Sequence, residues 1–333
     1  IHEQISRRYN IDAHEIGSGG YGKVFVATEK TSNRQVAIKK VAVLDSKTRN
    51  SFQQEVLLMK ELDHPNICRV LETYDQGRSL FIVMDYCEGG ELLDWILERA
   101  AISEEDSAEI LTQVAQALSY AHHRGIAHRD LKPENVCFLN KDPQNLDVKV
   151  IDWGVGHYFG THNMTRMSSD IGSSSYSAPE VLEASEGYYE ACDCWGLGVL
   201  AYILLSGLPP FTGSIGEQLE QMRENPCPTA GPEWECVSPD AKDLVAKLLK
   251  YSPDERLSAA DALRHPGLGG RRREADPQNL SRILSNLAKF TNSSYIFTVC
   301  AASVARQVDH RHLGDLQQAF SDMDSNRDGV LQK

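Results

Sequence analysis

Hydrophobic spacing divides the chain into a strand-rich part followed by a helix-rich part. Segments 23–28 and 35–40 are rich in β-branched and apolar residues, which predicts two neighbouring strands. Segment 51–62 instead places its apolar side chains at helical spacing. Segment 80–84 is a short apolar strand, and the loop-forming Glu88-Gly89-Gly90 follows it. The first part is therefore predicted to be a set of strands with one helix.

Helical periodicity dominates after that loop. Ser103 begins a helix with an apolar face, and Ser103-x-x-Asp106 resembles a capping box. Segment 194–205 is almost continuously apolar but too short to cross a membrane, which predicts a central buried helix. Glycine and arginine cluster at 266–273, where we place the boundary to a separate helical unit that starts at Asp276-Pro277.

Composition narrows the class of protein. The 333 residues and 41% hydrophobic content are enough for a large core. A net charge of −13 argues against nucleic acid as a partner and favours basic peptides, although the same charge also serves solubility. The 8 cysteines contain no Cys-x-x-Cys pair, and no apolar run has the length of a membrane span. We therefore expect a cytoplasmic protein without a disulfide framework.

Two motifs near the N-terminus carry groups suited to binding a nucleotide. The glycine-rich run 17–22 lets backbone amides approach phosphate oxygens, and it runs into a strand, which argues against a Rossmann loop. Val36-Ala37-Ile38-Lys39 places an ammonium on the next strand, suited to the α- and β-phosphates of ATP. Glu55, on the following helix, is the expected partner of Lys39. An ordinary turn, a solvated lysine and a surface ion pair are the alternative interpretations.

The run His128-Arg129-Asp130-Leu131-Lys132-Pro133-Glu134-Asn135 carries the chemistry of phosphoryl transfer. Asp130 is placed to accept the proton of a substrate hydroxyl or to orient that hydroxyl. Lys132 can neutralise the transferring γ-phosphoryl group. Asn135 and Asp152 offer hard oxygen ligands to Mg²⁺.

The order of these motifs resembles eukaryotic protein kinases across roughly residues 9–266. Further elements of that family are Ala178-Pro179-Glu180 and the run 193–198. Arg256 sits where the family pairs an arginine with that glutamate. The resemblance implies an α+β, bilobal eukaryotic protein kinase fold, with an antiparallel-sheet N-lobe at 1–84 and a helical C-lobe at 85–266. It implies ATP and Mg²⁺ as cofactors. It also implies nucleotide contacts from Ile16, Gly17, Gly19, Gly22, Val24, Ala37, Lys39, Met84, Asp85, Cys87, Asn135 and Asp152.

The resemblance also points to the phosphoacceptor. We expect serine or threonine, because Lys132 follows Asp130 by two residues and Ser173 fills the nearby hydroxyl position. Glu91 and Glu134 match positions that bind basic side chains upstream of the phosphoacceptor, although either can also be a solvated surface charge. The expected partners are protein or peptide substrates with a basic residue near the acceptor, and the enzyme is expected to be a monomer.

The segment between the metal-binding Asp152 and Ala178-Pro179-Glu180 is the expected place of regulation. Ser169 lies where many kinases carry an activating phosphate, with Asp170 beside it. Arg129 can pair with a phosphoserine or with a resident carboxylate, and both alternatives remain open. Asp152-Trp153-Gly154 replaces the usual Asp-Phe-Gly, and we hypothesise that the bulkier tryptophan hinders the inactive-state swing of this segment.

The end of the chain carries a calcium-binding pattern. Asp324, Asn326 and Asp328 occupy positions one, three and five of an EF-hand loop, and 311–322 is the expected entering helix. A random Asp/Asn-rich turn is the alternative. The bidentate glutamate would fall beyond Lys333, so we expect a trimmed chain that binds Ca²⁺ weakly and whose kinase activity is insensitive to calcium.

A kinase followed by an amphipathic region and an EF-hand resembles the calcium-dependent protein kinases of plants and apicomplexan parasites. The resemblance implies a regulatory junction at 274–308, a first EF-hand starting at 309–333, and an intramolecular calmodulin-like domain that uses Ca²⁺ in the full-length protein. The first half of the junction offers only Arg282 and Lys289, which favours inhibition by apolar docking. A kinase controlled by separate calmodulin and a calcium-sensing scaffold are the alternatives. Membrane contact is expected only through a lipid on an N-terminus that precedes Ile1.

Overall fold

The computed structural model describes residues 4–19, 22–99, 102–155, 157–158, 173–183 and 190–268. The chain divides into two compact units, Ile1–Ala288 and Lys289–Lys333, and all described residues belong to the first. Several predicted features lie outside the described residues, namely Ser169, Asp170, the junction at 274–308 and the EF-hand residues Asp324, Asn326 and Asp328.

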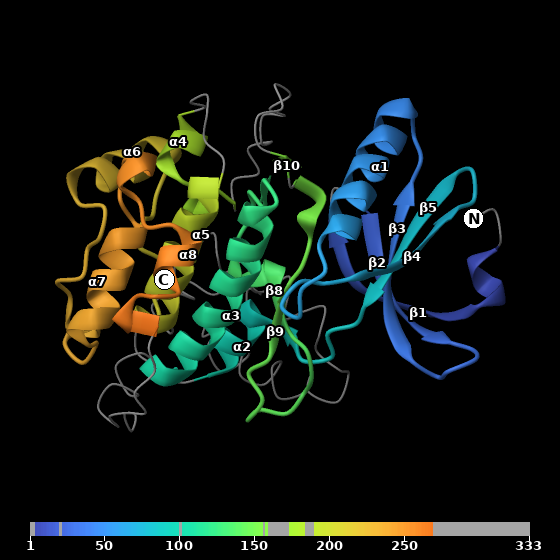
Figure 1. Cartoon of the computed structure of the whole chain (residues 1–333), viewed down its shortest axis with the longest axis horizontal. Helices are drawn as coiled ribbons and strands as arrows, with labels where there is room; N and C mark the ends of the chain where they lie inside the picture. Colours follow the sequence, from blue (N-terminus) through green and yellow to red (C-terminus); the bar gives the residue numbers. More distant parts are fainter. Residues whose placement is uncertain are drawn as a thin grey trace, which may run out of the picture. The chain divides into compact units, whose positions relative to one another are not determined.

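A five-stranded antiparallel sheet forms the N-lobe, in the order β1-β2-β3-β5-β4 (Figure 1). Its strands are β1 (Tyr9–Gly19), β2 (Gly22–Glu29), β3 (Gln35–Ala42), β4 (Val70–Asp75) and β5 (Ser79–Asp85). The strands predicted at 23–28, 35–40 and 80–84 are confirmed as parts of β2, β3 and β5. Apolar side chains on both faces of β3 and β5 are buried, as expected for short apolar runs: Ile38 lies in one core cluster, and Ile82 lies in another together with Phe52 and Val56.

Helix α1 (Ser46–Glu61) packs on this sheet through Phe52 and Val56 (Figure 1). It begins at Ser46, a turn or more before the predicted start. The cause is Asp45, whose carboxylate accepts a hydrogen bond from the Thr48 backbone amide at 2.7 Å and so caps the helix. The longer helix still presents Glu55 to the inside of the lobe, where its side chain is buried.

The C-lobe is built mainly from helices around α3 and α5. The helices are α2 (Leu92–Glu98), α3 (Glu104–His123), α4 (Pro179–Leu182), α5 (Glu190–Ser206), α6 (Ile215–Glu224), α7 (Pro239–Leu248) and α8 (Ala259–Ala262). The predicted buried helix at 194–205 is confirmed inside α5, whose side chains from Cys192 to Ser206 are all buried. Ser103 caps α3 as predicted, because its hydroxyl accepts a hydrogen bond from the Asp106 amide at 2.9 Å. No helix in the described part of the chain is both long and apolar enough to span a membrane.

Short strands of the C-lobe bring the polar motifs together beneath the N-lobe. One small sheet has the order β6-β8-β9, with β6 (Gly90–Glu91), β8 (Val136–Phe138) and β9 (Val148–Val150). A second pairs β7 (Ile126–Ala127) with β10 (His157–Tyr158). β8 follows directly on Asn135, and β9 leads into Asp152 after one residue. The sheet therefore fixes both predicted metal ligands relative to each other.

Candidate active site

A cavity of about 270 Å³ lies between the N-lobe sheet and the small sheet of the C-lobe. Its lining includes most of the predicted nucleotide contacts, namely Ile16, Gly17, Gly22, Val24, Ala37, Lys39, Met84, Asp85, Cys87, Asn135 and Asp152. The surroundings of Gly19 lie outside what the structure describes. Mixed apolar walls with a few convergent charges are typical of a small-molecule site.

The ends of β1 and β2 bring backbone to the wall of this cavity, where Gly17 and Gly22 are lining residues. Gly22 has φ of 132°, a conformation that side chains with a Cβ rarely adopt. A Cβ at this position would lie 2.4 Å from the carbonyl oxygen of Lys40 on β3. Glycine is therefore required for this tight pairing of β2 with β3.

Lys39 occupies the centre of a buried charge cluster. Its ammonium lies 2.6 Å from Glu55 Oε1 on α1 and 3.3 Å from Asp152 Oδ1. Burial by itself would lower the pKa of Lys39, but the carboxylates of Asp152 and Glu55 together raise it. The lysine is consequently held as a fixed cation that faces the cavity, which suits phosphate groups.

The catalytic run gathers its polar groups around Asp130. Lys132 Nζ lies 2.7 Å from Asp130 Oδ2, and the Asn135 amide donates to the same oxygen at 3.0 Å. Burial lowers the pKa of Lys132, but Asp130 outweighs it and raises that pKa overall. Asp130 is thus fixed by two donors as an oriented hydrogen-bond acceptor beside a fixed cation. That combination can align a hydroxyl nucleophile and stabilise negative charge on a transferring group.

Two side chains present oxygens suited to a divalent cation. Asn135 uses its amide nitrogen on Asp130, so its carbonyl oxygen remains as a potential ligand. The Asp152 side chain is 39% exposed, lines the cavity, and has its pKa lowered because Lys39 outweighs the effect of burial. Hard oxygen donors in a partly open site fit Mg²⁺ bound to nucleotide phosphates, which would neutralise phosphate charge there.

A buried aspartate on α5, Asp193, shapes the backbone of the catalytic run. The sequence identified this residue only as part of the family run 193–198. Asp193 on α5 is buried and accepts hydrogen bonds from the backbone amides of His128, at 2.8 Å, and Arg129, at 2.6 Å. His122 contacts the same carboxylate at 2.9 Å. Arg129 has φ of 70°, so this anchoring holds a backbone conformation that is unfavourable for arginine.

Trp153 fills the apolar position that follows Asp152. The side chain is fully buried, its indole N–H donates to the Val150 carbonyl at 3.4 Å, and its ring meets His128 edge-to-face at 4.6 Å. The predicted packing role is therefore confirmed. The hindered swing of the segment stays a prediction, which crystallisation with an inhibitor that requires the swung-out state would test.

The two carboxylates predicted to bind substrate also line the cavity. Glu91 ends β6, and Glu134 follows Lys132 and Pro133 in the catalytic run. Glu134 Oε2 is buried and has no hydrogen-bond partner among the described residues. Burial is the main cause that raises the pKa of Glu134. A buried oxygen without a donor is costly, so this carboxylate is suited to an incoming cation.

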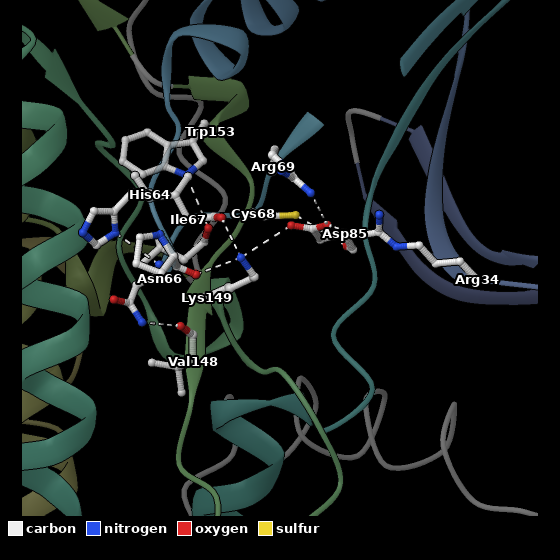
Figure 2. A network of polar contacts seen from close by, with 12 residues as sticks. Arg34, His64, Asn66, Ile67, Cys68, Arg69, Asp85, Val148, Lys149 and Trp153 are labelled. Atoms are coloured by element: carbon white, nitrogen blue, oxygen red, sulfur yellow. Dashed lines mark hydrogen bonds and ion pairs between the residues drawn. The ribbon is translucent and has the colours of Figure 1, made fainter. Parts of the chain in front are cut away.

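Sequence reasoning missed part of the cavity wall. Cys68 and Cys137 both line the cavity and both are buried. Lys149, on β9, lies just behind this wall and contacts Asp85, the first residue of the expected hinge 85–87 between the two lobes (Figure 2). The lysine and aspartate are 64 residues apart in sequence, so no local sequence pattern predicts their contact.

Comparison with known proteins agrees with this geometry. A protein kinase domain matches residues 11–268, and the chain therefore belongs to the protein kinase family, whose members are phosphotransferases that use ATP and Mg²⁺. Within that family the chain is similar to calcium-dependent protein kinases. It is 32% identical to calcium-dependent protein kinase 5 of Plasmodium falciparum (isolate 3D7) over 99% of this chain and 58% of that protein. It is 32% identical to calcium-dependent protein kinase 19 of Arabidopsis thaliana over 99% of this chain and 60% of that protein.

A solved structure shows the same fold. The twitchin kinase region from C. elegans superposes with a TM-score of 0.74 at 28% identity, covering 88% of this chain and 51% of that chain. The bilobal protein kinase fold expected from the motifs is thereby confirmed. The chain spans about 60% of the length of the curated relatives it matches.

Proposed function

We propose that this chain is an ATP- and Mg²⁺-dependent serine/threonine protein kinase. One cluster carries the proposal. In it the Asp130 carboxylate accepts hydrogen bonds from Lys132 at 2.7 Å and from Asn135 at 3.0 Å. This carboxylate is poised for a hydroxyl nucleophile, and Lys132 lies where negative charge on the transferred phosphoryl group would develop. The intact pair between Lys39 and Glu55 supports an active enzyme over a pure scaffold.

We infer that the preferred substrate carries a basic residue upstream of the acceptor. Glu134 supports this, because its buried Oε2 lacks a donor among the described residues and a guanidinium would supply one. Burial is the largest cause that raises the pKa of Glu134, and charge repulsion from Asp130 and then Asp94 raises it further. An arginine in this position would relieve that repulsion.

A matched set of peptides tests both statements. We expect phosphate transfer to a serine or threonine peptide with upstream arginine, and none to its tyrosine counterpart. Changing Glu134→Gln should raise KM for the arginine peptide about tenfold or more, since hydrogen bonds to charged groups contribute roughly 1.5–3 kcal/mol.

The control is a peptide in which alanine replaces the upstream arginine. Its KM should be the same for the parent and the Glu134→Gln variant. Equal losses on both peptides would show that Glu134 only supports the catalytic run, and efficient tyrosine phosphorylation would exclude the proposed class.

We also propose that the whole protein is regulated by calcium through an EF-hand to which Asp324, Asn326 and Asp328 contribute ligands. The names of the similar plant and Plasmodium kinases support this. Peptide phosphorylation by the present chain should differ by less than about twofold between Ca²⁺ and a chelator, because the loop lacks its bidentate glutamate. A longer chain that carries complete EF-hand loops after the kinase should respond several-fold. Several-fold stimulation of the present chain would contradict the expected insensitivity, and an extended chain without any response would contradict calcium control.

A further inference from the structure

A buried lysine joins three elements behind the nucleotide cavity. Lys149 lies in the middle of β9, and only 9% of its surface is exposed. Its ammonium donates to the carbonyl oxygens of Pro65 at 2.8 Å and Ile67 at 3.1 Å, and it lies 3.5 Å from Asp85 Oδ2 (Figure 2). A buried ammonium needs such partners, so its position is strongly constrained.

The aspartate at the other end of this contact is the first residue of the hinge. The Asp85 backbone continues into the cavity wall at Cys87, and its carbonyl accepts a weak hydrogen bond from Cys68 Sγ at 3.6 Å. Arg34, from the N-lobe, approaches the Asp85 carboxylate from the side opposite to Lys149, at 2.8 Å (Figure 2). Arg69 also contacts this carboxylate, at 3.9 Å, so Asp85 lies among Lys149 of the C-lobe, Arg34 of the N-lobe and Arg69 (Figure 2).

The loop contacted by Lys149 is itself fastened to β9. The Val150 amide donates to the Asn66 carbonyl at 2.8 Å, and the Cys68 amide donates to the Val150 carbonyl at 3.0 Å. The Asn66 side chain adds a bond to the Val148 carbonyl at 3.0 Å. These bonds hold the loop after α1 on the C-lobe, so Lys149 connects the hinge to a rigid C-lobe base.

We propose that Lys149 is a positioning residue for adenine recognition: by holding Asp85 against β9, it fixes the hinge backbone relative to the floor of the nucleotide cavity. β9 pairs with β8, which carries Cys137 in the cavity floor, so the contact between Lys149 and Asp85 links the edge of the base pocket to its floor. The Lys39–Glu55 pair is formed in the same structure, which associates this contact with the nucleotide-competent arrangement. Fixing a site in its bound geometry removes an ordering cost from binding.

Nucleotide affinity measures this role directly. Lys149→Met should raise Kd for Mg²⁺–ATP at least fivefold by calorimetry, because a loosened hinge populates the competent geometry less often. KM for ATP should rise in parallel, whereas kcat at saturating ATP and KM for the peptide should stay within about twofold. Lys149→Arg retains a cation that can reach the same oxygens and should restore most of the affinity.

Arg34→Met is the matched control, because it removes a cation from the same Asp85 carboxylate without cutting the contact with the C-lobe. It should leave Kd for ATP within about twofold of the parent. If Lys149→Met does not fold, as judged by thermal unfolding, Asp85→Asn provides the second test and should raise Kd in the same way. An unchanged or lower Kd in the folded variants overturns the proposal, as does an equal rise in Arg34→Met.

The inference rests on ATP binding in this cavity and on no particular phosphoacceptor. Calorimetry on the unmodified chain reports that binding even if no peptide is phosphorylated. A chain that binds ATP but phosphorylates neither serine nor threonine would therefore contradict the proposed function and leave the role of Lys149 intact. A parent chain that does not bind ATP would overturn both.

Discussion

Replacing Asp130 with asparagine should lower kcat by about 10²–10⁴-fold, the usual contribution of a positioned acid–base group. Asparagine keeps the shape of the side chain and can still accept a hydrogen bond from Lys132, which now donates at 2.7 Å. It cannot take a proton from a substrate hydroxyl. The loss should therefore appear in kcat, while Kd for ATP changes little because Asp130 does not line the nucleotide cavity.

Steady-state peptide phosphorylation together with ATP calorimetry checks this expectation. Asp254→Asn is a suitable control, because Asp254 is an exposed aspartate at the surface of the C-lobe. It makes the same chemical change and should leave kcat unaltered. An Asp130→Asn protein with more than a tenth of the parental kcat would show that this carboxylate is not the catalytic base. The same protein also tests the scaffold alternative, which requires all biological activity to survive the substitution.

The sequence predicted which polar residues form the site better than it predicted the contacts that hold them in place. Lys39, Asp130 and Asn135 could be proposed as site residues because each belongs to a short motif. The residue types in these motifs suit a phosphate group, a hydroxyl proton and a metal ion, respectively. Strands β2, β3 and β5 were also predictable, because each is a short run rich in β-branched or apolar residues, and β3 and β5 each bury four consecutive residues. Helix α1 was placed too late in the chain, since its first turns are held by the Asp45 cap and not by apolar periodicity.

The supporting contacts could not be predicted because they join residues distant in sequence. Asp193 reaches the amides of His128 and Arg129 across 65 and 64 residues, and such a bond exists only after α5 has packed against α3. Lys149 resembles an ordinary strand lysine in the sequence, and burial beside Asp85 is what gives it a role. Local patterns report propensity and burial, whereas tertiary packing selects the partners of buried charges.

Arg256 forms a buried ion pair that a sequence motif predicted and that tertiary packing brings together. The sequence matched Arg256 and Glu180 to an expected pair, and the structure shows a bidentate contact with distances of 2.6 and 3.0 Å. The Arg256 side chain is fully buried and also donates to the carbonyls of Ala191 and Lys250. The pair thereby fastens α4 to the start of α5 and to the loop after α7.

Arg256→Met should consequently destabilise the protein by about 3–5 kcal/mol, because it leaves the Glu180 carboxylate buried without its cation. Urea unfolding followed by tryptophan fluorescence measures this loss. The double variant Arg256→Met/Glu180→Gln should be less destabilised than the single one, since the uncompensated charge is removed together with its partner. Arg223→Met cuts an exposed pair with Glu183 and should have no measurable effect. If Arg256→Met unfolds at the parental urea concentration, or the double variant loses the full sum of both single losses, the pair does not anchor α4 in the way its geometry indicates.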